Sequence, residues 1–303
     1  MAAVSQSNLQ KLLVASDYAA TVKEDDNISA IENLSPSDFI CAVPWLLWCL
    51  DWRGSDWPWH LREEVARLII SRLSTTNPPS LEDPLISEIH SILADSHDSM
   101  LQYILLHQIL GFLPREHLEV YRDALIHLSR CHSQSDGEQT AAIFSRGSEL
   151  LRFLDATQAW VPAHKADDLA IRSLEILVHT ADDMRPHVVG LLEWLQDPNW
   201  PPYDGCWRQL KRFPELTIDP IRDELRKGED GWWELSLLTF LHRAAPPPMI
   251  DKARGEIERI AQCPTQEEID NDLVELAHEC LQQMDDEGER RKILRKITRH
   301  RDG

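Results

Sequence analysis

The sequence has few glycines, few basic residues for its many acidic ones, and no long apolar run. Only 11 of its 303 residues are glycine, which argues against a glycine-rich phosphate-binding enzyme and against an all-β protein full of tight turns. The 31 Lys and Arg against 51 Asp and Glu give a formal net charge of −20. Because a nucleic acid is a polyanion, such a chain is not expected to be a general nucleic-acid binder.

Membrane and export signals are also missing. A membrane helix needs roughly 18 consecutive apolar residues, whereas the best run, Phe39 to Leu50, is shorter and ends at Asp51. Residues 1–15 lack a basic start and a long apolar segment, so no secretory signal is expected. The six cysteines form no CxxC pair and are expected to be reduced and mostly buried. These features predict a protein of the cytoplasm, with the nucleus as an alternative, and no contact with membranes.

Helical periodicity runs through almost the whole chain. Apolar residues recur three and four positions apart, as on one face of a helix, for example at Leu61, Val65, Leu68, Ile69 and Leu73. Alternation typical of a half-buried strand does not persist anywhere. The sequence therefore predicts an all-α fold.

Prolines are expected at helix starts, after capping residues, and not inside helices. Ser35-Pro36, Asp83-Pro84 and Asp219-Pro220 each resemble a capping residue followed by proline at the first helical position. Thr265 and Glu268 have capping-box spacing and are expected to open a helix that runs through Leu281.

The chain also contains an internal repeat. Each copy has a Leu- and Trp-rich segment, a Trp-Pro pair and an acid-Pro pair, in the same order, followed by an apolar helix and a proline. The landmarks of the two copies are Leu46–Asp51, Trp57-Pro58, Asp83-Pro84 and Pro114, then Leu191–Gln196, Trp200-Pro201, Asp219-Pro220 and Pro246. Repeats of this kind predict a HEAT-like α-solenoid of antiparallel helix pairs, internally duplicated.

The second copy resembles a known family. Its stretch Leu191–Pro201, followed by Asp219-Pro220-Ile221 and Trp232–Leu238, is similar to the domain of unknown function 5071 family, a short HEAT-like helical module. The resemblance covers about residues 167–242. The first copy, near 25–113, is degenerate because Trp48 is shifted by one and Met100-Leu101 replaces the double tryptophan. The resemblance implies a fold and no reaction.

The repeat and the charge pattern together predict five segments. They are an N-terminal helix or arm (1–24), a degenerate first repeat module (25–132), a connecting helix and linker (133–165), a second repeat module (166–285) and a basic C-terminal tail helix (286–303).

Tryptophan is the most unusual residue, with 11 in all. Five lie close together at Trp45, Trp48, Trp52, Trp57 and Trp59. They could form an aromatic groove that holds a ligand or cation. We favour the alternative that these rings fill the joint between helices, because Trp-Pro recurs at equivalent places in both copies and a buried indole contributes a large apolar area.

The candidate partner-binding residues are Trp232, Trp233, Trp57, Trp59, Asp197 and Asn199. Asp197 and Asn199 could bind a ligand, although we favour a role in closing their loop. Adjacent rings on a helix point about 100° apart, so one of Trp232 and Trp233 can be buried while the other is a surface contact.

Signals for catalysis, cofactors and metals are poor, and none of the three is expected. His278-Glu279 lacks the second histidine that a zinc-protease helix needs. Paired carboxylates such as Glu63-Glu64 and Asp182-Asp183 lie near predicted helix ends, where they favour the helix dipole or face water.

The C-terminus reverses the charge balance, with seven Lys and Arg and no acid in residues 290–301. It could be a nuclear-import or nucleic-acid tail, or a basic amphipathic helix for an acidic surface. The alternative that we favour is a terminal cap that packs on the last helix pair.

These observations predict a non-catalytic helical-repeat binding or scaffold protein. It would engage another protein, with a basic partner favoured by the charge, through an acidic, tryptophan-bearing surface. Two alternatives stay open: an enzyme with its site in the crevice between the two modules, and a structural protein whose second copy stabilises the first.

Overall fold

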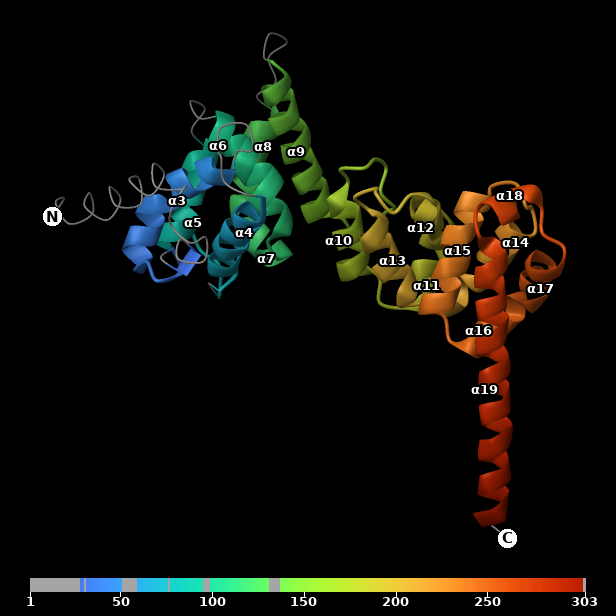
Figure 1. Cartoon of the computed structure of the whole chain (residues 1–303). Coiled ribbons are helices and arrows are strands. Elements are labelled where there is room, and N and C mark those ends of the chain that lie inside the picture. Colours follow the sequence, from blue (N-terminus) through green and yellow to red (C-terminus); the bar gives the residue numbers. More distant parts are fainter. Residues whose placement is uncertain are drawn as a thin grey trace, which may run out of the picture. The chain divides into compact units, whose positions relative to one another are not determined.

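The computed structural model in Figure 1 describes residues 28–29, 31–50, 59–75, 77–94, 99–130 and 137–301. Within these ranges every regular element is a helix and no strand occurs. The predicted all-α fold is therefore confirmed. The N-terminal arm predicted over 1–24, and Trp52 and Trp57 with their surroundings, lie outside the described residues.

The chain divides into two compact units, Met1–Asp155 and Ala156–Gly303. Unit 1 contains α3 (Pro36–Leu50), α4 (Trp59–Ser74), α5 (Pro84–Ala94), α6 (Ser99–Ile104), a π-helix η1 (Leu105–Ile109), η2 (Leu110–Phe112), α7 (Arg115–Leu118), η3 (Glu119–Tyr121), α8 (Arg122–Arg130) and α9 (Glu138–Asp155).

Unit 2 is built in the same way from short helices joined by tight turns. Its elements are α10 (Asp168–Leu177), α11 (Ala181–Met184), η4 (Arg185–His187), α12 (Val188–Glu193), η5 (Trp194–Gln196), α13 (Tyr203–Lys211), η6 (Pro214–Leu216), α14 (Ile218–Leu225), α15 (Gly231–Ala244), α16 (Pro247–Ile250), η7 (Asp251–Ala253), α17 (Arg254–Gln262), α18 (Gln266–Asp270) and α19 (Leu273–Arg301).

Two of the predicted helix starts are confirmed. α3 begins at Pro36, and the N–H of Asp38 donates to Ser35 Oγ at 3.2 Å. α5 begins at Pro84, and Asp83 Oδ1 accepts from the first free N–H groups of this helix at 2.9 and 3.1 Å. Each capping oxygen satisfies donors that have no partner inside the helix.

Three details differ from the sequence predictions. α14 begins at Ile218, so Asp219 lies in the first turn and does not precede the helix. Pro220 is tolerated there because the first four N–H groups of a helix have no internal partner. Pro44 lies inside α3, where seven buried side chains offset the lost hydrogen bond. The helix expected from Thr265 to Leu281 is broken at Asp272, whose φ of 59° ends α18 and redirects the chain into α19.

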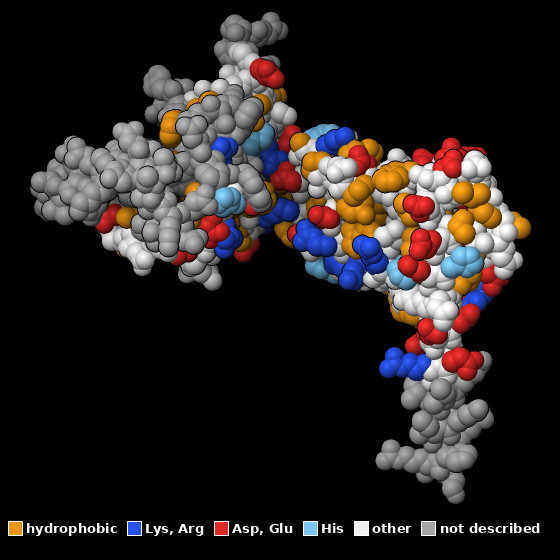
Figure 2. Space-filling model, in the orientation of Figure 1, with side chains coloured by type: hydrophobic (Ala, Val, Ile, Leu, Met, Phe, Trp, Pro, Cys, Tyr) orange, Lys and Arg blue, Asp and Glu red, His pale blue; other side chains and the backbone are white. Residues whose placement is uncertain are grey.

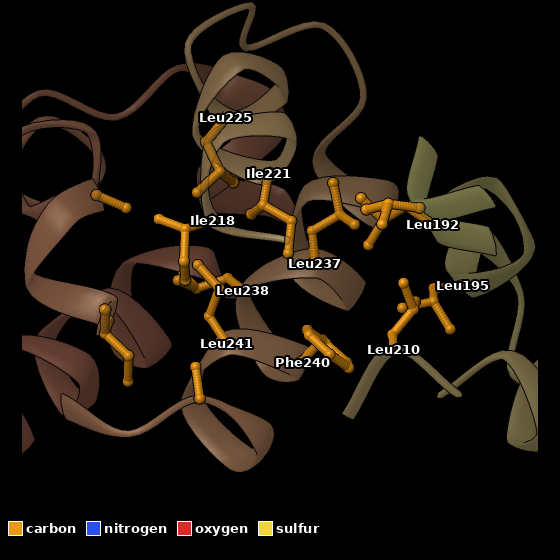
Figure 3. Packing of buried hydrophobic residues seen from close by; sticks show 14 of the residues in the cluster. Leu192, Leu195, Leu210, Ile218, Ile221, Leu225, Leu237, Leu238, Phe240 and Leu241 are labelled. Carbon is orange, nitrogen blue, oxygen red and sulfur yellow. The ribbon is translucent and has the colours of Figure 1, made fainter. Parts of the chain in front are cut away.

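The hydrophobic core of unit 2 surrounds α15. Leu237, Leu238 and Leu241 of this helix lie against Ile218 and Ile221 of α14 (Figure 3), and all five side chains are almost fully buried. Helix α15 also contacts η5, α16, α18 and α19. Burial of one such aliphatic side chain contributes about 1.5–3 kcal/mol, so the position of α15 is strongly fixed.

The last helix continues to the end of the described chain. α19 contacts α15, α16, α17 and α18 through its first part, and Figure 1 shows its C-terminal part extending away from these helices. The backbone over the predicted basic tail is therefore helical through Arg301 and continuous with the preceding helix. None of the helices in the described part of the chain has the length and apolar composition that a bilayer crossing requires.

We expect a fragment of residues 156–303 to fold alone and to unfold in one cooperative transition, because its core from Ile171 to Met284 is complete within it. A fragment that starts at Ala163 should be less stable by about 1–3 kcal/mol, since it lacks the Pro162 carbonyl that accepts from Trp194. Circular dichroism melts of the two fragments provide the measurement. Identical melting curves, or an unfolded 156–303 fragment, would contradict this prediction.

Candidate functional site

The loop after η5 forms a tightly bonded corner. The Trp194 indole Nε1 donates to the carbonyl of Pro162 at 3.0 Å. Trp200 packs edge-on against Trp194, with ring centroids 5.4 Å apart, and the Lys165 ammonium lies 4.9 Å from the Trp200 ring. Aromatic pairs and cation–π contacts of this kind hold a loop in one conformation. The two indoles therefore connect the segment before α10 to the turn between α12 and α13.

Asp197 and Asn199 are part of this corner. Asp197 Oδ1 accepts from the Asn199 backbone N–H at 2.8 Å and from its side-chain amide at 3.0 Å. The carbonyl of Asp197 accepts from the N–H of Trp200 at 3.0 Å. This is the arrangement of an Asx turn. The polar groups of Asp197 are thus used within the loop, as the favoured interpretation of the sequence expects.

The first turn of α15 separates the two adjacent tryptophans. Asp230 caps the helix by accepting from the Trp233 N–H at 3.0 Å. The Trp232 side chain is 53% exposed, whereas Trp233 packs against the core. The Trp233 Nε1 is buried and has no hydrogen-bond partner among the described groups. Trp232 is thus the more exposed of the two rings, and Trp233 is partly buried. Trp57 lies outside the described residues, as does the Trp59 side chain. Trp48, which was expected to fill a joint between helices, is instead 47% exposed.

The surface beside Trp232 includes α18. Gly231 packs directly on the last turn of α18, and the two helices contact each other. Ile269 on α18 is 49% exposed, and its neighbours Glu267 and Asp270 also face solvent. We call the exposed side chains of Trp232 and Ile269, which lie on these two contacting helices, together the Trp232 surface.

A buried carboxyl pair lies under this surface. Glu234 of α15 and Glu268 of α18 are both almost fully buried. Burial raises the pKa of Glu234 to about 7, and the negative charge of Glu268 acts in the same direction. Near neutral pH, Glu234 therefore titrates, and its protonated form can donate to Glu268.

Glu268 behaves in the opposite way. Burial alone would raise its pKa, but hydrogen bonds from the Arg259 guanidinium and from the backbone of Thr265 hold the pKa below its ordinary value. Arg259 donates to the two carboxylate oxygens at 3.1 and 2.5 Å, and the Thr265 N–H donates at 2.6 Å. This confirms the predicted capping box of Thr265 and Glu268. Glu268 thus stays ionised beside a carboxyl group that holds its proton.

The three buried cysteines in the described part of the chain are not activated. Burial raises the pKa of Cys49, Cys206 and Cys280 to about 12, so these thiols stay protonated and unreactive. Cys41 and Cys263 are exposed, and all five described cysteines are free. Within the described ranges no group of three or more His, Cys, Asp or Glu side chains is arranged to hold a metal ion.

Comparison with known proteins agrees with this geometry. Residues 160–281 match the family described as domain of unknown function (DUF5071). This stretch of the chain is therefore similar to the DUF5071 family, and we call residues 160–281 the DUF5071 region. The match begins at Trp160, just before the Pro162 carbonyl that holds Trp194, and ends within α19. The DUF5071 region thus includes the whole Trp194–Trp200 corner and the Trp232 surface. No curated protein matches the chain.

Two charged residues of this region were not predicted from the sequence. Glu234 follows the double tryptophan, and Arg259 has no distinctive neighbours in the sequence. A signal for Glu234 does exist, because it lies on the same face of α15 as Leu237, Leu238 and Leu241. A carboxylate on an apolar face requires a partner, and the tertiary structure supplies Glu268 with Arg259.

Proposed function

We propose that the chain is an internally duplicated, HEAT-like array of helix pairs. One support is a matched order of elements. In each unit an extended proline, Pro114 or Pro246, precedes an α-helix of four residues, a 3-10 helix of three and an α-helix of nine. Identical lengths in three successive elements are not expected of unrelated segments.

An arginine cluster at equivalent positions gives a second support. Arg122 begins α8, donates to Glu119 at 2.5 Å and pairs with Asp155 at 2.8 Å. Arg254 begins α17, donates to Asp251 at 2.7 Å and pairs with Asp285 at 3.0 Å. Each arginine therefore forms one ion pair with the acid three residues before it and another with an acid on the last long helix of its unit.

We further propose that the DUF5071 region is a non-catalytic binding module for a basic protein. Residues 156–289 contain 28 Asp and Glu against 13 Lys and Arg, and Figure 2 shows acidic side chains interspersed with hydrophobic ones on the visible face of unit 2. Such a field attracts a positively charged partner at long range and favours rapid association. The proposal places the protein in the cytoplasm or nucleus, where such partners occur.

The single observation that carries this role is the exposure of Trp232. A tryptophan that folding leaves 53% exposed forgoes a large gain from burial, whereas its neighbour Trp233 is partly buried against the core. Exposed tryptophans next to a polar rim are frequent anchors of protein interfaces. The Trp232 surface has both features, with Ile269 as a second apolar contact.

We expect Trp232→Ala to lower the capture of basic proteins by immobilised full-length chain at least tenfold, since an interface anchor contributes about 2 kcal/mol or more. Val189→Ala is the matched control, because Val189 is also exposed in unit 2 and lies on α12. Pull-downs with wild type and both variants at low and raised salt give the measurement. Equal capture by wild type and Trp232→Ala, or recovery of acidic proteins only, would refute the proposed role.

A further inference from the structure

Unit 1 contains a pocket of about 520 Å³ between α4 and the turn formed by η1 and η2. Ala66 and Gln108 lie on its two sides, and Phe112, which is 52% exposed, lies at its edge. Pockets of this volume are typical of small-molecule sites. The pocket is separate from the Trp232 surface, which belongs to unit 2.

The proposed duplication gives the equivalent place in unit 2. Arg122 and Arg254 occupy equivalent positions in the two units. Gln108 and Phe240 lie the same number of residues before these arginines, so Gln108 corresponds to Phe240. On α4 the buried residues Leu61, Val65 and Ile69 have the spacing of Pro202, Cys206 and Leu210 around α13. In this register, which differs by two residues from that of the Trp57-Pro58 and Trp200-Pro201 pairs, Ala66 is the counterpart of Trp207.

In unit 2 this place is filled by aromatic rings. The Trp207 and Phe240 rings pack edge to face with centroids 4.9 Å apart, and Tyr203 lies 5.9 Å from Trp207. In unit 1 a methyl group and an amide stand where the indole and phenyl rings would be, and the Gln108 amide is held by the Leu50 carbonyl at 3.2 Å. The volume of two missing rings is thus left open.

The backbone of unit 1 also differs at this place. Leu105–Ile109 form a π-helix, whereas α15 is a continuous α-helix over the equivalent residues. A π turn inserted into a helix is rare and is frequently found at functional sites. It carries His107, whose ring stacks on Tyr103 with centroids 4.4 Å apart and which also lines the pocket.

The charged side chains around the pocket favour an anion. Arg62 and Arg67 line it together with one acid, Glu63, in a chain whose net charge is −20. Arg67 is 71% exposed and pairs with Glu64, so its guanidinium retains donors for a ligand. A guanidinium can bind a carboxylate through two parallel N–H donors.

We propose that this pocket binds a small aromatic carboxylate, with the ring in the place that Trp207 fills in unit 2. The ring would lie between Ala66 and Phe112, and the carboxylate would reach Arg62 or Arg67. The inference rests on the duplication proposed above and is independent of the partner proposed for the Trp232 surface.

The test uses the full-length chain and two probes, indole-3-propionate and its neutral amide, in ligand-observed NMR and calorimetry. We expect saturable binding of the carboxylate with a Kd of about 1 mM or lower and at least fivefold weaker binding of the amide. No saturable binding, or equal binding of both probes, would overturn the proposal.

Two variants locate the site. Ala66→Trp should reduce binding of the carboxylate at least tenfold by restoring the missing indole, with the circular dichroism spectrum unchanged. Arg62→Gln leaves the shape of the pocket intact and should weaken the carboxylate about tenfold without affecting the amide. Arg208→Gln is the matched control, because Arg208 lies on α13 of unit 2 and is 68% exposed. Unchanged binding by both pocket variants would overturn the assignment even if the Trp232 experiment succeeds.

Discussion

Gly231→Ala is expected to lower the free energy of unfolding of unit 2 by about 3 kcal/mol. A Cβ atom at Gly231 would lie 2.6 Å from the carbonyl oxygen of Glu267 and 2.8 Å from the Asn271 amide nitrogen. The first contact is with backbone at the end of α18, which cannot rotate away. Inserting one methyl into such a contact forces α15 and α18 apart and typically costs 1–3 kcal/mol or more.

Gly255→Ala is the control for this substitution. Gly255 lies in α17, and nothing lies within 4 Å of the position of its Cβ. Alanine there should stabilise the fold by about 0.5–1 kcal/mol, since it restricts the unfolded chain and favours the helix. Urea denaturation of both variants gives the comparison. If Gly231→Ala is as stable as wild type, α15 and α18 do not pack as described.

Glu234→Gln is expected to stabilise the protein at alkaline pH by up to about 3 kcal/mol and to have little effect near pH 4.5. The unfolded chain titrates Glu234 near 4.5, whereas burial raises the folded pKa to about 7. Between these values the folded state holds the extra proton, so the free energy of unfolding falls as pH rises from 4.5 to 7. Glutamine imitates the protonated acid and does not titrate, and its amide can donate to Glu268.

The measurement is the difference in unfolding free energy between Glu234→Gln and wild type at pH 5 and pH 8. We expect this difference to grow with pH and to level off above about 7. Glu193→Gln serves as the control because Glu193 is exposed on α12 of the same unit. A difference that is constant with pH would show that Glu234 is ionised in the folded protein throughout this range.

Much of the secondary structure followed from short-range chemistry. A side-chain oxygen before a proline identified the starts of α3 and α5, and the capping box identified the start of α18. The predictions were wrong where tertiary packing outweighs local preference. Pro44 is accommodated inside α3 because the residues around it are buried. No pattern in the sequence predicted the left-handed backbone conformation of Asp272.

The candidate site was predictable in outline. The sequence offered Trp232, Trp233, Trp57 and Trp59 as candidate surface contacts, and it favoured a loop-closing role for Asp197. It did not indicate which ring faces solvent, because that depends on the direction from which the rest of unit 2 packs on α15. For the same reason, the sequence could not predict that Glu268 lies beside Glu234, since the two residues are 34 positions apart in the chain.

The helical fold class, the acidic charge and the resemblance of about residues 167–242 to the DUF5071 family could be predicted from sequence, because periodicity, charge and motif are local properties of the chain. Three features could be seen only in the folded chain: Trp232 is more exposed than Trp233, burial raises the pKa of Glu234 to about 7, and Ala66 and Gln108 line a pocket. Those outcomes depend on neighbours brought together from distant segments, and burial, desolvation and packing volume arise only when those neighbours are in place.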